Sequence, residues 1–318
     1  MHLSTYYYPL PPLLLANFFH LCYNTSMNRN IFQLDNCKLC PLECGVNRLT
    51  NKGVCGANGI RLAKYYLHPF EEPCISFKKG SGTVFFVGCN LKCVFCQNYP
   101  LSRAERGKEF TAQELADIFK KLEDMGAENI SLVTAGHLLP WILPAFEIYK
   151  PKIPVVYNSS GYEKLETLQI LDPFVDIYLP DMKFYSPTLS KRYTRREDYF
   201  EVASKAIEFM AKKPLLMTEE GKMLSGVIVR HLVMPLGVKD SKAILKWFKN
   251  QLPPTVYLSL MSQYTPYGKV EACPELNRPV TAREYESVVE EAFRLGIDKI
   301  FLQERSSSSE KFIPDWEF

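Results

Sequence analysis

The sequence has little net charge, few cysteines for its length and no apolar run long enough to cross a membrane. Its 318 residues carry a formal net charge of +3, and acidic and basic side chains are interspersed, so there is no basic stripe of the kind that binds nucleic acid. Ten cysteines are too sparse for a disulfide scaffold, and we infer a reducing compartment. We therefore expect a cytoplasmic protein without a nucleic-acid partner.

The N-terminal region does not have the pattern of a targeting segment. Residues 10–22 are mostly apolar, but they include Pro11, Pro12 and His20, are shorter than a membrane span and follow no basic residue. We expect neither a signal peptide nor a membrane partner. Because Met27 opens a stretch of more ordinary composition, we interpret residues 1–36 as an extension that is dispensable before Met27.

Three cysteines follow the apolar run at residues 83–87: Cys89, Cys93 and Cys96, spaced C-x3-C-x2-C. Cysteine thiolates usually ligate one iron each, so three of them leave one iron of a 4Fe-4S cube open to another ligand. A zinc site would need a fourth ligand, which is missing locally. We therefore predict a 4Fe-4S cluster on this loop, in preference to zinc, a disulfide or unrelated buried cysteines.

A second group comprises Cys37, Cys40, Cys44 and Cys55, spaced C-x2-C-x3-C-x10-C around glycine-bearing turns. Four thiolates suffice for a closed tetrahedral zinc site or for a whole iron-sulfur cluster. Spacing alone does not choose between zinc and a second cluster, so both stay open. We interpret residues 37–78 as a cysteine-rich metal-binding segment.

From residue 83 onward, short apolar runs alternate with helical patterns, which is typical of parallel βα units. Seven runs predict strands, at residues 83–87, 129–133, 154–157, 175–179, 227–234, 255–261 and 299–302. Polar residues lie where these strands end, and in a βα barrel such ends converge on one face. We predict an α/β fold: a partial (β/α)6-type TIM barrel of six or seven strands at residues 79–305, with a tail at 306–318.

Two Thr-x-x-Glu capping boxes, at residues 111–114 and 281–284, predict helix starts. The apolar spacing after each box predicts one buried face, which extends to Met125 in the first helix and to Phe293 in the second. Gly126 and Gly296 are expected to end these helices.

The three-cysteine loop, with Phe95 before its last cysteine, resembles the signature of the radical S-adenosylmethionine (SAM) enzymes. Further matches resemble proteins related to the pyruvate formate-lyase activating enzyme, in the branch with an N-terminal C-x2-C-P segment. These matches lie at residues 37–41, 82–86, 96–99, 157–162, 176–183 and 230–235. The resemblance runs from about residue 37 to residue 316.

This resemblance implies a radical SAM type of barrel whose reduced cluster cleaves SAM to methionine and a 5'-deoxyadenosyl radical, which abstracts hydrogen from a substrate. It also implies an electron donor such as flavodoxin or ferredoxin. Asp181 and Lys183 are similar by position to an Asp-x-Lys pair near the methionine carboxylate. Arg230 is similar to an arginine that holds the cofactor, and Asn158 and Ser160 lie where the family has a cofactor-side loop.

The chain departs from the activating enzymes in two places. Residues 134–137 read Thr-Ala-Gly-His, where those enzymes have a Gly-Gly-Glu type motif that binds the methionine amino group. Another acceptor is needed, such as a carbonyl near Gly136 or the Thr134 hydroxyl, and we interpret His137 as a cap or a local hydrogen-bond partner. In addition, the four-cysteine segment precedes the cluster loop, whereas extra clusters follow it in the activating enzymes. Both differences weaken glycyl-radical activation as the reaction and leave radical initiation intact.

We therefore expect a radical SAM enzyme whose substrate the sequence does not identify, with a protein glycine as one candidate. A rival hypothesis is a non-catalytic iron-sulfur protein that transfers electrons or senses redox state. A third hypothesis, compatible with the first, treats the four-cysteine site as a zinc-stabilised module that docks a partner protein.

Overall fold

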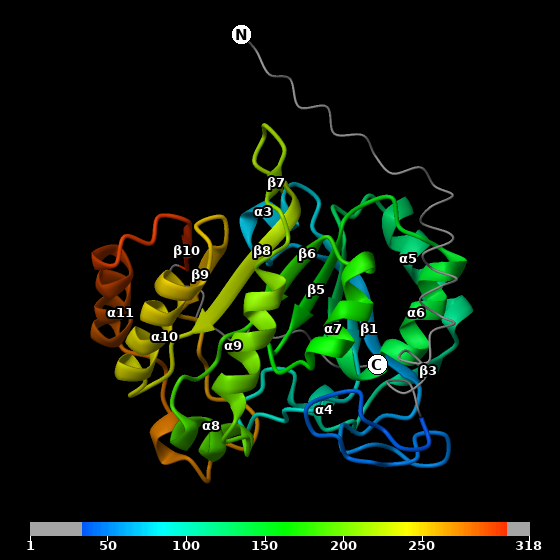
Figure 1. Cartoon of the computed structure of the whole chain (residues 1–318), viewed down its shortest axis with the longest axis horizontal. Helices are drawn as coiled ribbons and strands as arrows, with labels where there is room; N and C mark the ends of the chain where they lie inside the picture. Colours follow the sequence, from blue (N-terminus) through cyan, green and yellow to red (C-terminus); the bar gives the residue numbers. More distant parts are fainter. Residues whose placement is uncertain (1–33, 304–318) are drawn as a thin grey trace.

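The computed structural model describes residues 34–303. The predictions for the segment before Met27 and for the tail at 306–318 lie outside these residues. Within the described chain, ten strands form one sheet in the order β10-β9-β8-β6-β5-β4-β2-β1-β3, and β7 pairs with β8 off this path. Figure 1 shows the sheet curving inside a layer of helices.

Seven strands run parallel and correspond to the seven predicted apolar runs. They are β2 (Ser81–Phe86), β4 (Ile130–Val133), β5 (Val155–Ser159), β6 (Ile177–Pro180), β8 (Met223–Leu232), β9 (Tyr257–Met261) and β10 (Ile300–Leu302). Strands β2, β4, β5 and β6 are buried along their whole length. Burial on both faces explains why they read as continuous apolar runs.

Three strands were not expected: β1 (Ile60–His68), β3 (Lys108–Phe110) and β7 (Leu216–Met217). Strand β1 lies within the cysteine-rich segment and pairs antiparallel with β2, and β3 pairs antiparallel with β1. The described sheet therefore has β10 and β3 at its two ends. This open, mainly parallel sheet confirms the predicted partial barrel.

Helices follow most of the parallel strands and cover the outside of the sheet (Figure 1). The longer ones are α5 (Ala112–Asp124), α6 (Leu139–Ile148), α7 (Leu165–Leu171), α8 (Pro187–Thr194), α9 (Tyr199–Met210), α10 (Val238–Gln251) and α11 (Ala282–Arg294). Single turns are α3 (Pro73–Ser76), α4 (Tyr99–Ser102), η1 (Gly136–Leu138), η2 (Asp172–Phe174) and η3 (Pro274–Leu276).

Both predicted capping boxes are present, at the N-termini of α5 and α11. The predicted buried faces extend less far than expected. Met125 follows the last residue of α5 and is 49% exposed, and Phe293, in the last turn of α11, is 58% exposed. Apolar periodicity therefore identified the helices but overestimated their buried faces at the C-terminal ends, where the chain turns away from the sheet.

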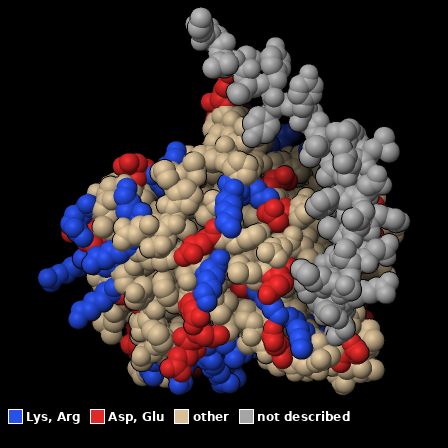
Figure 2. All heavy atoms as spheres, viewed as in Figure 1, with Lys and Arg blue, Asp and Glu red and all other residues tan. Residues whose placement is uncertain are grey.

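The face of the molecule shown in Figure 2 carries Lys and Arg side chains interspersed with Asp and Glu side chains. This mixture agrees with the even distribution of charge along the sequence. Among residues 34–303, no helix has the length and apolar character needed to cross a lipid bilayer.

The loop after β5 is held by a close backbone approach that requires glycine. Gly161 has a φ of +75°, and a Cβ atom on it would lie 2.5 Å from the carbonyl oxygen of Asp181. Its N–H donates to the Ser159 hydroxyl at 3.1 Å. Gly161 thus fixes the ends of β5 and β6 side by side.

We predict that Gly161→Ala lowers the free energy of unfolding by about 3 kcal/mol, because strain at positive φ adds to a clash with backbone. Gly221→Ala is the matched control, since Gly221 has a φ of +89° with no atom within 4 Å of the added Cβ. The control should lose only about 1 kcal/mol. If urea unfolding showed the same loss of free energy in both variants, the contact with the Asp181 carbonyl would not be what excludes a side chain at residue 161.

Candidate functional site

One cavity of about 540 Å³ brings together the three cysteines of the cluster loop and the five polar residues predicted to hold the cofactor. Its lining includes Cys89, Cys93, Cys96, Asn158, Ser160, Asp181, Lys183 and Arg230. These residues come from the C-terminal parts of β2, β5, β6 and β8 and from the loops that follow them. The convergence expected for a βα barrel therefore occurs.

The cluster loop begins at Gly88, which has a φ of +95°. A Cβ atom there would lie 2.6 Å from the carbonyl oxygen of Cys55 and 2.9 Å from Nε2 of His137. Further along, the N–H of Val94 donates to the carbonyl of Tyr193 at 3.0 Å. The loop is therefore clamped between the N-terminal segment and the C-terminal half of the barrel.

Cys89 and Cys93 are buried and Cys96 is half-buried, and the three thiols influence one another electrostatically. Burial raises the pKa of Cys93 and of Cys96, and Lys183 acts in the opposite direction on both. The N–H of Leu91 donates to Sγ of Cys89 at 3.4 Å. Three cysteine thiols beside the ammonium group of Lys183 form a site that suits a cofactor ligated by thiolates.

These three thiols fit a cubane cluster better than a single ion. Among residues 34–303, no group of three or more Cys, His, Asp or Glu side chains is arranged to hold one metal ion. Thiolates of a cubane bind different irons and need not converge on one point. Cys89, Cys93 and Cys96 line one cavity, as three ligands of a single cluster must.

A network of charged side chains centres on Asp181. Its Oδ2 accepts from Lys183 Nζ at 2.6 Å and its Oδ1 from Arg230 Nε at 3.0 Å. Arg230 also donates to Asn158 Oδ1 at 2.6 Å and to Glu71 Oε2 at 3.2 Å. Burial opposes a charged Asp181, but Lys183 and Arg230 outweigh it and hold its pKa below the ordinary value. Asp181 is therefore held as a carboxylate between Lys183 and Arg230, and these contacts fix the three side chains in place.

Two acidic residues of this cavity were not predicted from the sequence. Glu71 and Glu72 lie between β1 and α3 and line the cavity. Burial raises the pKa of each carboxyl, and Arg230 opposes that rise. Oε2 of Glu72 is buried without a hydrogen-bond partner. In the sequence, only the position of Glu71 and Glu72 shortly after β1 could have indicated that they line the cavity. The sequence analysis did not predict β1.

The segment at 134–137 contributes less to the cavity than expected. Thr134, with a φ of +61°, lines it, whereas Gly136 and His137 are absent from the lining. A Cβ atom on Gly136 would lie 2.6 Å from Oε2 of Glu163. Nε2 of His137 contacts the carbonyl oxygen of Val87 at 3.1 Å, and burial lowers the pKa of this imidazole to about 4. His137 is thus a neutral structural partner of β2.

The four-cysteine group lies beside the cluster loop. Burial raises the pKa of Cys40 to about 12 and raises that of Cys55. At Cys44, burial is outweighed by backbone N–H groups, Cys37 and the charge of Arg48, so the pKa lies below its ordinary value. Each of these three thiols is influenced by at least one other cysteine of the group, so the four cysteines lie near one another, and their role as metal ligands stays a prediction.

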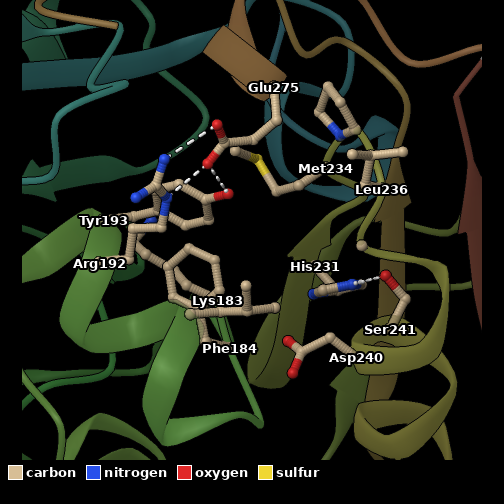
Figure 3. Close-up of a pocket in the computed structure, with 13 residues that line it drawn as sticks. Lys183, Phe184, Arg192, Tyr193, His231, Met234, Leu236, Asp240, Ser241 and Glu275 are labelled. Carbon is tan, nitrogen blue, oxygen red and sulfur yellow. Dashed lines mark hydrogen bonds and ion pairs between the residues drawn. The ribbon is translucent and has the colours of Figure 1, made fainter. Parts of the chain in front are cut away.

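A second pocket, of about 370 Å³, also has Lys183 in its lining (Figure 3). Arg192 and Tyr193 both donate to Glu275, at 2.5 Å and 2.8 Å, on one wall. His231 contacts the Ser241 hydroxyl at 2.8 Å on another. No cysteine lines this pocket, so the cluster site is the larger cavity.

Comparisons with known proteins agree with this site. The family model described as the radical SAM superfamily matches residues 83–216, a range that contains the three-cysteine loop, Asn158, Ser160, Asp181 and Lys183. Arg230 and the four-cysteine group lie outside it. An uncharacterized protein of Methanocaldococcus jannaschii is 33% identical over 284 residues, covering 86% of this chain and 78% of its own.

Solved structures match this chain at low identity and low TM-score. A domain of the pyruvate-formate lyase-activating enzyme from Bacteroides vulgatus is 12% identical, with a TM-score of 0.37, over 61% of this chain and 91% of its own. Streptococcus suis SuiB bound to the precursor peptide SuiA is 14% identical, with a TM-score of 0.46, over 68% and 46%. From the family match and the cysteine loop, we conclude that the chain belongs to the radical SAM superfamily, whose members use a 4Fe-4S cluster and SAM.

Proposed function

We propose that this protein uses a 4Fe-4S cluster on Cys89, Cys93 and Cys96 to cleave SAM reductively and to abstract hydrogen from a substrate. The cluster and SAM supply the radical chemistry, and the chain supplies binding, orientation and exclusion of water. The observation that carries this proposal is the single cavity lined by the three thiols and by Asp181 and Lys183.

The polar residues take distinct roles in this proposal. Lys183, held by Asp181, binds the methionine carboxylate of SAM through its ammonium group. Arg230 fixes Asp181 and Asn158 in place and, with Ser160, forms the cofactor-side wall. These residues orient the cofactor and do not transfer protons.

The cavity also needs an acceptor for the methionine amino group, because the usual Gly-Gly-Glu type motif is missing. Thr134 lines the cavity, and its hydroxyl is our candidate for that role. Glu72 adds a buried carboxylate oxygen without a partner, which suits an N–H group or a cation at the substrate end of the cavity. The carbonyl near Gly136 is no longer our candidate, since this residue does not line the cavity.

We propose a protein segment as the substrate, with a glycine as one candidate. Two large apolar side chains that line the cavity are exposed: Phe70 at 60% and Leu302 at 42%. Exposed apolar side chains of this size favour contact with another macromolecule.

We further propose that a flavodoxin or ferredoxin supplies the electron and that residues 37–78 form a metal-binding unit on the 79–305 barrel.

We predict that Cys96→Ala abolishes the formation of 5'-deoxyadenosine, because two thiolates do not retain a site-differentiated cluster. The measurement is anaerobic reconstitution, dithionite reduction with SAM, and quantification of 5'-deoxyadenosine and iron. Cys74→Ala is the control, because Cys74 is a buried cysteine that lies outside the cavity, and it should retain activity. SAM cleavage that survives Cys96→Ala would falsify the assignment. If the unsubstituted protein held a full cluster but neither bound nor cleaved SAM, the result would favour the non-catalytic electron carrier.

We predict that Lys183→Met weakens SAM binding about 10-fold to 100-fold, as expected for loss of one charge-assisted hydrogen bond. Isothermal titration of SAM into the reconstituted protein measures this, with iron content as a check on the cluster. Lys191→Met is the control, since it removes a surface ion pair of 2.8 Å with Glu197. An unchanged affinity in Lys183→Met would assign the carboxylate to another group.

A further inference from the structure

The cavity of the candidate site extends toward the end of the sheet that lies opposite the cluster loop. His68, the last residue of β1, pairs with Ser81, the first residue of β2, so the chain leaves β1 where β2 begins. The cluster loop follows the other end of β2, about 17 Å away for a strand of six residues. Figure 1 shows α3 and α4, which follow β1 and the cluster loop respectively, at opposite ends of the sheet.

Helix α3 closes the barrel at this end. Ile75 of α3 is 1% exposed and belongs to one buried apolar cluster with Val156 of β5 and Ile228 of β8. Glu71 and Glu72 directly precede α3 and line the cavity. The two carboxyl groups therefore lie at the floor of the cavity, and a ligand does not reach them past α3.

The ion pairs of the cavity leave one of its carboxyl groups without a cation. Among its lining residues, the Asp and Glu side chains are Glu71, Glu72 and Asp181, and the Lys and Arg side chains are Lys183 and Arg230. Both cations bind Asp181, and Arg230 also binds Glu71. Within residues 34–303, no ion pair involves Glu72.

Glu72 is nevertheless deeply buried. It is 8% exposed, and among residues 34–303 its Oε2 has no hydrogen-bond partner. The Ser259 side chain hydrogen-bonds to the same carboxyl group, which places Glu72 beside β9. A buried carboxylate without a counter-charge is costly, and a bound cation would remove that cost.

The wall beside Glu72 is mainly apolar. Phe301 of β10 pairs in register with Ser259 of β9, and both line the cavity together with Met261 and Leu302. An apolar wall that leads to a buried carboxylate suits an alkyl chain with a cationic end, because such a chain buries its stem while its charge needs a partner.

We propose that Glu72 determines substrate specificity by binding an ammonium or guanidinium group at the end of an alkyl chain of the substrate. Glu71, held by Arg230 and Asn158, adds negative charge to the same floor. This inference rests on the proposed function, in which the substrate is a protein segment; a Lys or Arg side chain of that segment supplies the cation. The carbon that loses hydrogen then lies nearer the cluster than the cation does.

SAM also carries cationic groups, but the proposed function places it at the other end of the cavity. Its carboxylate binds Lys183, which follows β6 and whose charge acts on the thiol of Cys93 in the cluster loop. Glu72 precedes α3, where the strands begin. We therefore assign Glu72 to the substrate and not to SAM.

The unsubstituted protein tests the charge preference. The probes are the Nα-acetyl N-methylamides of lysine and norleucine, which differ by the terminal ammonium group, and they are titrated calorimetrically into reconstituted full-length protein with SAM bound. The lysine probe should bind at least tenfold more tightly. Equal affinities, or no binding of the lysine probe, would overturn the proposal, and this result stands even where a variant fails to fold.

Two further probes identify the chemistry of the cation and its source. The arginine analogue distinguishes a guanidinium group from an ammonium group. The ion n-pentylammonium lacks the peptide groups, so weaker binding than that of the lysine probe would indicate a protein segment, and equal binding would indicate a free amine. Each of these outcomes supports a cation site at Glu72.

Glu72→Gln should lower the affinity for the lysine probe at least tenfold and leave the affinities for the norleucine probe and for SAM unchanged. Glu163→Gln is the matched control, because Glu163 is 7% exposed and absent from the cavity lining, and it should change none of the three. An equal loss for both probes in Glu72→Gln would assign this residue a structural role. A loss of SAM affinity would assign it to the cofactor. Either result would overturn the proposal.

Failure of the proposed function has a separate readout in the same preparations. Dithionite reduction with SAM and no probe should give 5'-deoxyadenosine in the unsubstituted protein and in Glu72→Gln. If the unsubstituted protein gave none, the proposed function itself would fail. If it cleaved SAM but did not discriminate between the lysine and norleucine probes, only the role of Glu72 would be refuted.

Discussion

The buried network around Asp181 is the constraint on which the rest of the site depends. Its two carboxylate oxygens bind Lys183 and Arg230, which come from the ends of β6 and β8. Breaking such a pair leaves an uncompensated buried charge, which costs about 3–5 kcal/mol. The contacts of Asp181 therefore fix the relative position of β6 and β8 and also shape the wall of the cavity.

The two cysteine groups differ electrostatically from Asp181, because burial disfavours the charged form of most of their thiols. Burial raises the pKa of Cys93, Cys96, Cys40 and Cys55, so without a metal these thiols favour the neutral form. Each group nevertheless lies beside a buried cation, Lys183 for the loop and Arg48 for the N-terminal site. Such surroundings are costly for an empty site and favourable for a bound anionic centre, because metal binding deprotonates the thiols. This balance supports our proposal that both groups bind a metal centre.

The sequence predicted the parts of the fold that are buried on both faces and missed those that are not. Continuous apolar runs located the seven parallel strands, and capping boxes located α5 and α11. Strand β1 mixes apolar with charged residues and is only partly buried, so it does not read as a continuous apolar run, and Glu71 and Glu72 were missed with it. Spacing divided the cysteines into two groups, but the hydrogen bond of 3.0 Å from the N–H of Cys89 to the carbonyl oxygen of Cys55 depends on tertiary packing that spacing does not encode.

The altered motif after β4 shows why a family pattern does not transfer residue by residue. Where the activating enzymes have an acidic side chain, this chain has Gly136, packed so closely that a Cβ atom would lie 2.4 Å from the Tyr157 hydroxyl oxygen. The neighbouring carboxylate, Glu163, is buried on the far side, and burial raises its pKa to about 7. That position is closed to a ligand, whereas the loop between β1 and α3 brings Glu71 and Glu72 into the cavity. Glu71 and Glu72 thus reach the cavity from the loop after β1, and Asp181 reaches it from the end of β6, so the acidic groups of the cavity do not depend on the altered motif.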